Sequence, residues 1–397
     1  MCGQVDLRVH LFEKKDYCCN MDTTNIHIAG SQAVQLMRMA RKGDLVSGVP
    51  AVGYRIDAGG SSIGNAADLG IDGLLCALGI NENRPLTLLV PNDAARCWRN
   101  ESLSFIKTYT LSVSLPDDAF IELKPGRGRN AIGFPEDVRV FISGIGLEVI
   151  DGARKIGRSI KRGRMSELQG FLRVLEFVDE CCGTYSRNYD NPCAGDVVYD
   201  EISHPTRFSD LYSLQSFLDK ARHIDGLSLA HRAARYAIDG SGSPMETYIN
   251  HALTLPPKYA GLSMHKPIVN QQLRLGSEDK VLLKHKSLRP DFQWPQYHML
   301  AEYLGEKDHS SKSARVEDKN RMQDYAITPY AAFPLMFDDV KNAATINKTA
   351  EMLAGEFMRR GVRSELYRVR RLLKNEDFLA KQRVLVGTLL PPLMRYE

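Results

Sequence analysis

Residues 289–305 read Arg-Pro-Asp-Phe-Gln-Trp-Pro-Gln-Tyr-His-Met-Leu-Ala-Glu-Tyr-Leu-Gly, and they are the most informative segment of the chain. It predicts two adjacent strands joined by a short turn, with Pro290 at an edge or bend of the first strand. Asp291 and Glu302 would then face each other across the strand pair. Carboxylates at adjacent strand ends can hold Mg²⁺ or Mn²⁺, which lowers the pKa of a bound water and stabilises a phosphorane-like oxyanion. The stretch therefore predicts a metal site built on Asp291 and Glu302.

Glu302 interrupts an apolar run, with Met299-Leu300-Ala301 before it and Tyr303-Leu304 after it. A carboxylate inside a central strand costs several kcal/mol unless it is paired or binds metal. We therefore expect Glu302 to be functional, because buried acids with perturbed pKa values cluster at functional sites. Asp291 has a plainer alternative, since an aspartate after a proline can simply start a turn.

Length and composition restrict the classes of protein to which the chain can belong. The chain has 397 residues, of which 43% are hydrophobic and 25% charged, and this length predicts two domains of ordinary soluble composition. The net charge of +4 is mild, so a nucleic acid would have to bind local basic patches. No stretch is apolar enough to predict a membrane helix, and the charged N-terminus does not predict a secretory signal. The eight cysteines include no CxxC pair, which favours reduced thiols and a cytoplasmic location.

The N-terminal half predicts an α/β domain over residues 1–185. Its periodicity predicts one amphipathic helix within 24–50 and a helix over 166–182. Residues 184–209 are polar and predict a linker, so that 186–239 would form a linker and a connecting helix. The expected strands are 86–90, 109–115 and 119–124, and the connecting helix lies within 211–237.

The C-terminal domain is expected over 240–360, followed by a basic helix or tail at 361–397. Ser243, Pro244 and Glu246 predict a helix start, with the serine as N-cap and the glutamate in a capping box. The elements that follow are predicted strands at 279–285, 288–294 and 298–304, a helix at 313–325, a strand at 327–333 and a helix at 339–360. The predicted order is α-β-β-β-α-β.

Five weak motifs occur in a fixed order in this region. They are Ser243-Pro-Met-Glu246, Asp291 with Trp294-Pro295, Glu302-Tyr303, His309, and Asp318 with Arg321. In this order residues 240–342 resemble the PD-(D/E)XK nucleases of the very-short-patch-repair type, and more narrowly an actinobacterial group related to the C-terminal regions of AbiEi-like proteins. The resemblance implies a restriction-endonuclease-like fold with the α-β-β-β-α-β core.

The resemblance also implies roles for single residues. Asp291 and Glu302 would be ligands of Mg²⁺ or Mn²⁺, and Glu246 a further acid facing the site. His309 would be the general base or would orient the water, and Asp318 and Arg321 would position the site or a phosphate. Each has a simpler interpretation: Glu246 in a capping box, His309 in a solvated loop, Asp318 and Arg321 as an ion pair on a helix surface. The implied activity is hydrolysis of DNA phosphodiester bonds in phage defence, mobile elements or repair.

One position departs from the family pattern. Leu304 stands where relatives have the second acid or the lysine of the motif, and strand alternation places it on the same side as Glu302. Glu306 or Lys307 could substitute by reaching back. The alternative function is therefore an inactive, nuclease-fold DNA-binding or antitoxin-like regulator. A further alternative is that the N-terminal domain binds a protein partner and the nuclease fold is only a dimerisation platform. The expected protein partners are a second copy of the chain, as a homodimer, or a toxin/antitoxin-type protein.

Two basic stretches are candidates for DNA contact. Charge runs are usually solvated faces, but arginines and lysines that neutralise phosphates supply most non-specific affinity for DNA. The candidate residues are Arg158, Lys161, Arg162, Arg368, Arg370 and Arg371.

Overall fold

The computed structural model describes residues 24–43, 45–51, 71–80, 86–90, 106–108, 115–116, 118–187, 195–197, 209–276, 281, 283–285, 287–304 and 312–391. These residues form two compact units, with the division between Gly144 and Ile145 and with residues 115–116 assigned to the second unit. The expected boundary at residue 185 therefore falls inside the second unit. Both units combine helices with strands, so the fold class is mixed α/β. None of the helices in these ranges is long and apolar enough to span a membrane.

The first unit is a six-stranded sheet in the order β2-β5-β6-β1-β3-β4. Its elements are β1 (Thr24–Ile28), α2 (Ser31–Lys42), β2 (Val46–Pro50), α3 (Asp72–Ala77), β3 (Leu88–Val90), β4 (Ile106–Thr108), β5 (Phe120–Pro125) and β6 (Val138–Ser143). Strand β1 runs parallel to β6, and β2, β5 and β6 pair antiparallel. The expected strand at 109–115 lies largely outside the described residues.

The single helix expected within 24–50 is wrong in extent, because the segment forms β1, α2 and β2 in turn. Ile26 and Ile28 alternate with polar residues and are fully buried, which is the period-two pattern of a strand. Gly43 ends α2 in the left-handed region at φ 77°, where glycine has no steric penalty.

Four helices open the second unit. They are α4 (Ile145–Lys161), α5 (Glu167–Cys182), α6 (Leu211–Lys220) and α7 (Leu227–Ala234). The helix expected within 211–237 is thus two helices. Ser166 caps α5 in a reciprocal capping box with Gln169. The expected linker contains the strands β7 (Tyr185–Arg187) and β8 (Gly195–Val197), and Tyr185 is fully buried, so the segment at this end belongs to the packed core.

A four-stranded sheet in the order β12-β11-β10-β9 forms the centre of the C-terminal part of this unit. Its elements and helices are α8 (Pro244–Thr254), η4 (Pro257–Tyr259), β9 (Ile268–Val269), β10 (Phe292–Trp294), η5 (Pro295–Tyr297), β11 (Met299–Leu304), α10 (Lys312–Ile327), β12 (Ala331–Met336) and η7 (Phe337–Asp339). Strands β9, β10 and β11 pair antiparallel, and the crossover through α10 makes β12 parallel to β11.

The first strand of this sheet is misplaced in the sequence prediction. It is Ile268–Val269, and the described residues within 279–285 form no strand. The backbone N–H groups of Lys284 and His285 donate to the side-chain oxygens of Asp324 on α10, each at 3.0 Å. A side chain therefore satisfies the backbone donors that a neighbouring strand would otherwise bind.

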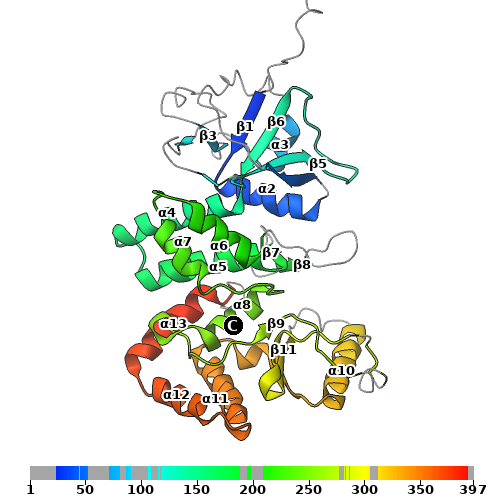
Figure 1. The fold of residues 1–397 in the computed structure, drawn as a ribbon, viewed down its shortest axis with the longest axis vertical. Coiled ribbons are helices and arrows are strands. Elements are labelled where there is room, and N and C mark those ends of the chain that lie inside the picture. The colour runs from blue at the N-terminus through cyan, green and yellow to red at the C-terminus, as the bar shows by residue number, and fades with distance from the viewer. Residues whose placement is uncertain are drawn as a thin grey trace, which may run out of the picture. The chain divides into compact units, whose positions relative to one another are not determined.

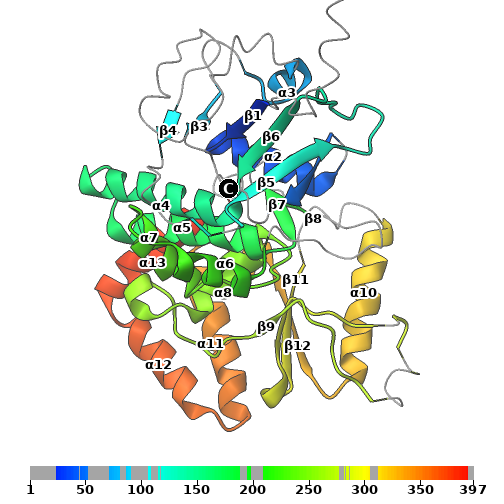
Figure 2. The same ribbon diagram turned by 45° about the horizontal axis from the view of Figure 1, so that its top comes forward.

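The sheet packs helices on both faces, with α10 on one side and α8 and α11 on the other (Figure 2). Trp294 contacts Phe357 of α11 edge-on, at 5.5 Å between ring centroids. On the opposite face, Leu300 and Tyr325 belong to one buried cluster.

Residues 361–391 do not form a separate tail. The last helices are α11 (Ala343–Arg359), α12 (Arg363–Leu373) and α13 (Glu376–Leu389), drawn in orange and red in Figure 1. Helix α13 packs against α5 and α8 and buries Leu385 and Leu389. The C-terminal segment is therefore part of the core of the second unit.

Candidate active site

Asp291 and Glu302 lie opposite each other at the open end of the β10–β11 hairpin. Phe292 pairs with Ala301, so Asp291 and Glu302, the next residue of each strand toward the open end, lie side by side. The N–H of Asp291 donates to Oε2 of Glu302 at 3.3 Å, and the N–H of Tyr303 donates to Oδ2 of Asp291 at 2.6 Å. The two carboxylates thus face each other, as the strand spacing predicted.

Glu246 joins this pair from the first turn of α8. Ser243 is the N-cap and accepts from the N–H of Glu246 at 3.1 Å, as predicted. The Glu246 carboxylate does not complete the expected capping box. Its Oε2 instead accepts from the N–H of Gly242 at 2.7 Å and from Nδ2 of Asn270 at 2.5 Å. A Cβ at position 242 would come within 3.1 Å of Glu246 Oε1, so the glycine allows this close approach.

Helix α10 supplies the groups that bind Glu302 from the other side. Arg321 Nη1 donates to Oε1 of Glu302 at 2.7 Å, and the Tyr325 hydroxyl donates to Oε2 at 3.0 Å. The two donors are four residues apart, so they lie on one face of the helix. The Glu302 side chain is 2% exposed and that of Arg321 40% exposed. Both oxygens of Glu302 are therefore engaged by α10.

The three carboxyl groups repel one another. Burial raises the pKa of Glu246, Asp291 and Glu302, and repulsion by neighbouring carboxylates adds to the rise for Glu246 and Asp291. For Asp291, burial comes first, followed by the charges of Glu246 and Glu302, and its pKa lies well above the usual range. Arg321 opposes the rise for Glu302, and the bonds from Gly242 and Asn270 oppose it for Glu246. The cluster therefore favours a bound cation or a retained proton.

The chemistry of this cluster fits Mg²⁺ or Mn²⁺, which prefer carboxylate and water oxygens. Among the described residues, no group of three or more His, Cys, Asp or Glu side chains is arranged to hold a metal ion. Two carboxylates are enough for Mg²⁺, because it usually keeps several waters. The bonds described above use Oδ2 of Asp291 and Oε2 of Glu246, so Oδ1 and Oε1 are the oxygens that would bind the ion.

Of the residues predicted for the site, the structure brings together Glu246, Asp291, Glu302 and Arg321. Asp318 is half-buried on α10, one turn before Arg321. His309 lies outside the described residues, as do Glu306 and Lys307.

Leu304 is the last residue of β11, half-buried and paired with Met336 of β12. Its place in the strand puts it on the same side as Glu302, two residues along. Position 304 carries no charge, and Arg321 of α10 is the described cation that contacts the Glu302 carboxylate.

The predicted DNA-contacting residues belong to other elements. Arg158, Lys161 and Arg162 are exposed at the end of α4. On α12, Arg368 donates to the buried Glu365 and Arg370 lies 3.4 Å from Glu351, whereas Arg371 is exposed. Helix α12 therefore offers less unpaired positive charge than its sequence suggests.

Three residues of the cluster, Gly242, Asn270 and Tyr325, were not predicted from the sequence. Tyr325 had a signal, since it follows Arg321 by four residues on the same predicted helix. Asn270 directly follows β9 and has a φ of 49°, a left-handed conformation that asparagine tolerates. Its approach to Glu246 depends on the placement of β9 beside α8, which local sequence does not encode.

Comparison with known proteins adds no family: no family model, no curated protein and no solved structure matches this chain. The class that the structure defines is a mixed α/β protein with a buried cluster of three acidic side chains at the open end of a β-hairpin.

Proposed function

We propose that this chain is a metal-dependent nuclease that hydrolyses DNA phosphodiester bonds, with its site at Glu246, Asp291 and Glu302. The observation that carries the proposal is the cluster itself, in which three carboxyl groups with raised pKa values meet beside Arg321. Repulsion between buried carboxylates destabilises the fold, and acids with perturbed pKa values concentrate at catalytic sites.

The order of elements around the cluster supports the same proposal. Among the described residues, helix α8, strands β9, β10 and β11, helix α10 and strand β12 occur in the order α-β-β-β-α-β, with the short η4 and η5 between them. This is the order of the restriction-endonuclease-like core, to which we assign the C-terminal part of the second unit. In this assignment Asp291 and Glu302 occupy the two strand positions of the PD-(D/E)XK motif.

Each residue has a chemical task in the proposed reaction. Asp291 and Glu246 would hold Mg²⁺ or Mn²⁺ through Oδ1 and Oε1, and Glu302 would add its negative charge beside them. The bound ion would lower the pKa of a water and neutralise charge on the phosphate. Arg321 and Tyr325 orient the Glu302 carboxylate and keep its charged form stable. Asn270 and the N–H of Gly242 fix Glu246 in the same way.

A second candidate function rests on a different observation. Leu304 offers neither a proton nor a charge, and both oxygens of Glu302 are engaged by Arg321 and Tyr325. These features favour a regulator that keeps the nuclease fold and binds DNA without cleaving it. The two functions differ in whether the acidic cluster performs chemistry.

The test is cleavage of single-stranded, duplex and mismatched DNA by the full chain, with Mg²⁺, with Mn²⁺ and with chelator. The variant is Asp291→Asn, and the matched control is Asp338→Asn, whose carboxylate is 78% exposed on η7. We expect metal-dependent cleavage that Asp291→Asn abolishes and Asp338→Asn retains. Absence of cleavage of every substrate, together with DNA affinity that falls steeply with salt, would establish the regulator instead.

A further inference from the structure

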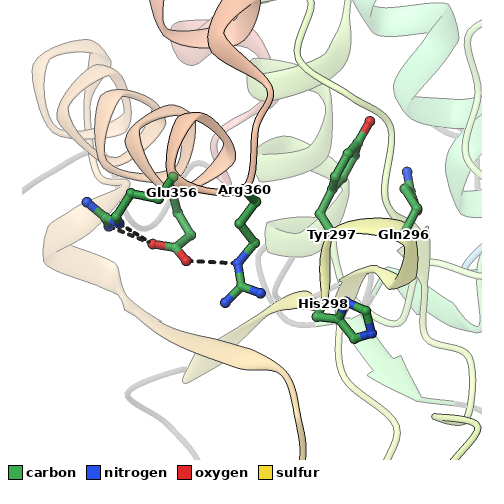
Figure 3. A pocket seen from close by; sticks show the side chains of 6 residues that line it. Gln296, Tyr297, His298, Glu356 and Arg360 are labelled. Atoms are coloured by element: carbon green, nitrogen blue, oxygen red, sulfur yellow. Dashed lines mark hydrogen bonds and ion pairs between the residues drawn. The ribbon is translucent and has the colours of Figure 1, made fainter.

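A polar pocket lies at the closed end of the β10–β11 hairpin, between η5 and the last turn of α11 (Figure 3). Its volume is about 400 Å³. The lining residues are Gln296, Tyr297, His298, Glu356, Arg359 and Arg360. His298 is four residues from Glu302 along the extended strand, or about 13 Å at 3.3 Å per residue. The pocket is therefore separate from the acidic cluster.

The floor of this pocket is held in place by packing. The Tyr297 ring contacts Phe357 edge-on at 5.2 Å between centroids. The N–H of His298 donates to the carbonyl of Pro295 at 3.1 Å, and the His298 carbonyl accepts from the N–H of Ala331 at 2.8 Å. These bonds hold His298 at a φ of 47°. The turn is thus preorganised, which lowers the entropy cost of binding a ligand.

The wall formed by α11 carries an excess of positive charge. Arg359 donates to Oε2 of Glu356 at 2.6 Å, and Arg360 Nε donates to Oε1 at 2.9 Å. Although burial opposes it, these two arginines lower the pKa of Glu356, so the carboxylate stays charged. Two guanidinium charges against one carboxylate leave one positive charge at the pocket wall.

Arg360 points this charge into the pocket. Its bond to Glu356 uses Nε, and one of its two Nη groups lies on the side of His298 in Figure 3. The His298 ring can donate a further hydrogen bond to a ligand, whereas the Gln296 side chain points away from Arg360 and His298 in Figure 3. A guanidinium edge with a neighbouring imidazole donor is suited to the tetrahedral oxygens of a phosphate.

We propose that this pocket binds a phosphate group through Arg360 and His298. The phosphate is either part of a nucleic acid backbone or a free phosphate or mononucleotide. The first source rests on the proposed function and would give DNA a second anchor about 13 Å from the acidic cluster. The second source is independent of it.

The primary test measures the thermal stability of the full chain in inorganic phosphate and in chloride at equal ionic strength, with chelator present. A ligand that binds only the folded state raises the melting temperature. We expect phosphate to stabilise the wild type and Arg363→Ala, but not Arg360→Ala. Arg363 is the matched control, because it is an exposed arginine on the next helix that does not line the pocket. An equal rise in Arg360→Ala, or none in the wild type, would overturn the proposal.

A second pair of variants separates binding from folding. His298→Asn keeps a residue that tolerates positive φ, and Arg360→Lys keeps the charge but loses the planar fork. We expect both to fold with wild-type circular dichroism and to lose most of the stabilisation by phosphate. Full retention of that stabilisation in both variants would show that ordinary ionic strength effects cause it.

A third measurement identifies the source of the phosphate. Anisotropy of a labelled duplex, in chelator so that no cleavage is needed, compares Arg360→Ala with Arg363→Ala. A loss of about tenfold in affinity confined to Arg360→Ala assigns the pocket to the nucleic acid backbone. Equal duplex affinities, with protection by a nucleoside monophosphate lost only in Arg360→Ala, assign it to free phosphate ligands. Neither result depends on whether the acidic cluster cleaves DNA.

Discussion

Arg321 Nη1 donates a hydrogen bond to Oε1 of Glu302 at 2.7 Å, from helix α10, which connects β11 to β12. The guanidinium is 40% exposed, whereas the carboxylate is 2% exposed. The pair thus links the surface of α10 to the most deeply buried charge of the acidic cluster. The position of the Glu302 carboxylate therefore depends on how α10 packs against the sheet.

Arg321→Ala should lower the free energy of unfolding by about 2 kcal/mol, because it leaves the buried Glu302 carboxylate without its cation. This value is below that of a fully buried pair because water screens a partly exposed arginine. Arg370→Ala is the control: its side chain is 61% exposed and lies 3.4 Å from Glu351, so its loss should cost less than about 1 kcal/mol. Urea unfolding of both variants measures the difference, and equal losses would contradict the role of Arg321.

Asp291→Asn should stabilise the protein increasingly as the pH rises. The ordinary carboxyl pKa values are 3.8 for Asp and 4.5 for Glu, and those of Asp291, Glu246 and Glu302 are raised in the folded state. Above the ordinary values the folded protein therefore binds more protons than the unfolded chain, and its stability falls as the pH rises through the raised values. Asparagine removes one of these charges and still accepts from Tyr303.

The measurement is the free energy of unfolding across this pH window, without metal, for Asp291→Asn and for the exposed control Asp338→Asn. Only Asp291→Asn should reduce the fall in the free energy of unfolding as the pH rises. Added Mg²⁺ should stabilise the wild type most at the high end of the window, where the carboxylates are charged. A parallel pH dependence in all three proteins would show that the cluster does not carry the effect.

Gly242→Ala should destabilise the second unit by about 1–2 kcal/mol through overpacking. The new Cβ would lie 3.1 Å from Oε1 of Glu246 and 3.2 Å from Nδ2 of Asn270, and neither group can move without breaking their mutual bond. Gly157→Ala, inside α4, meets nothing within 4 Å and should stabilise by about 0.5–1 kcal/mol, since alanine favours helix. Thermal unfolding of the two variants should shift in opposite directions.

Leu304→Lys should raise metal-dependent DNA cleavage at least about tenfold, because a positioned proton donor or charge contributes 10²–10⁴-fold in suitable sites. Met336→Lys is the control, as Met336 is the residue of β12 that pairs with Leu304 and is 42% exposed. Cleavage rates at saturating metal compare the two variants. No increase with Leu304→Lys would mean that Arg321 already supplies the cation or that the site lacks other machinery.

The sequence was informative about the β10–β11 hairpin for a physical reason. An acid within an apolar strand is costly, so Glu302 signalled a compensating partner. Strand periodicity then placed Asp291 opposite it. Arg321 was also identified, although its role as the direct partner of Glu302 emerged only from the fold.

The rest of the site depends on contacts between distant segments. Glu246 looked like half of a local capping box, but Asn270, 24 residues later, captures its carboxylate. The apolar run at 279–285 resembled a strand, yet Asp324 binds the backbone there. Tertiary hydrogen bonds of this kind override local propensity, and no local pattern encodes them.

The four-stranded sheet also limits how the protein can associate. Strand β9 has two residues, and β12, at the opposite edge, carries Pro334, which has no N–H to donate. Exposed strand edges are templates for pairing between chains, and short strands and edge prolines block that pairing. The short β9 and the proline of β12 therefore disfavour edge-to-edge pairing of this sheet with another chain.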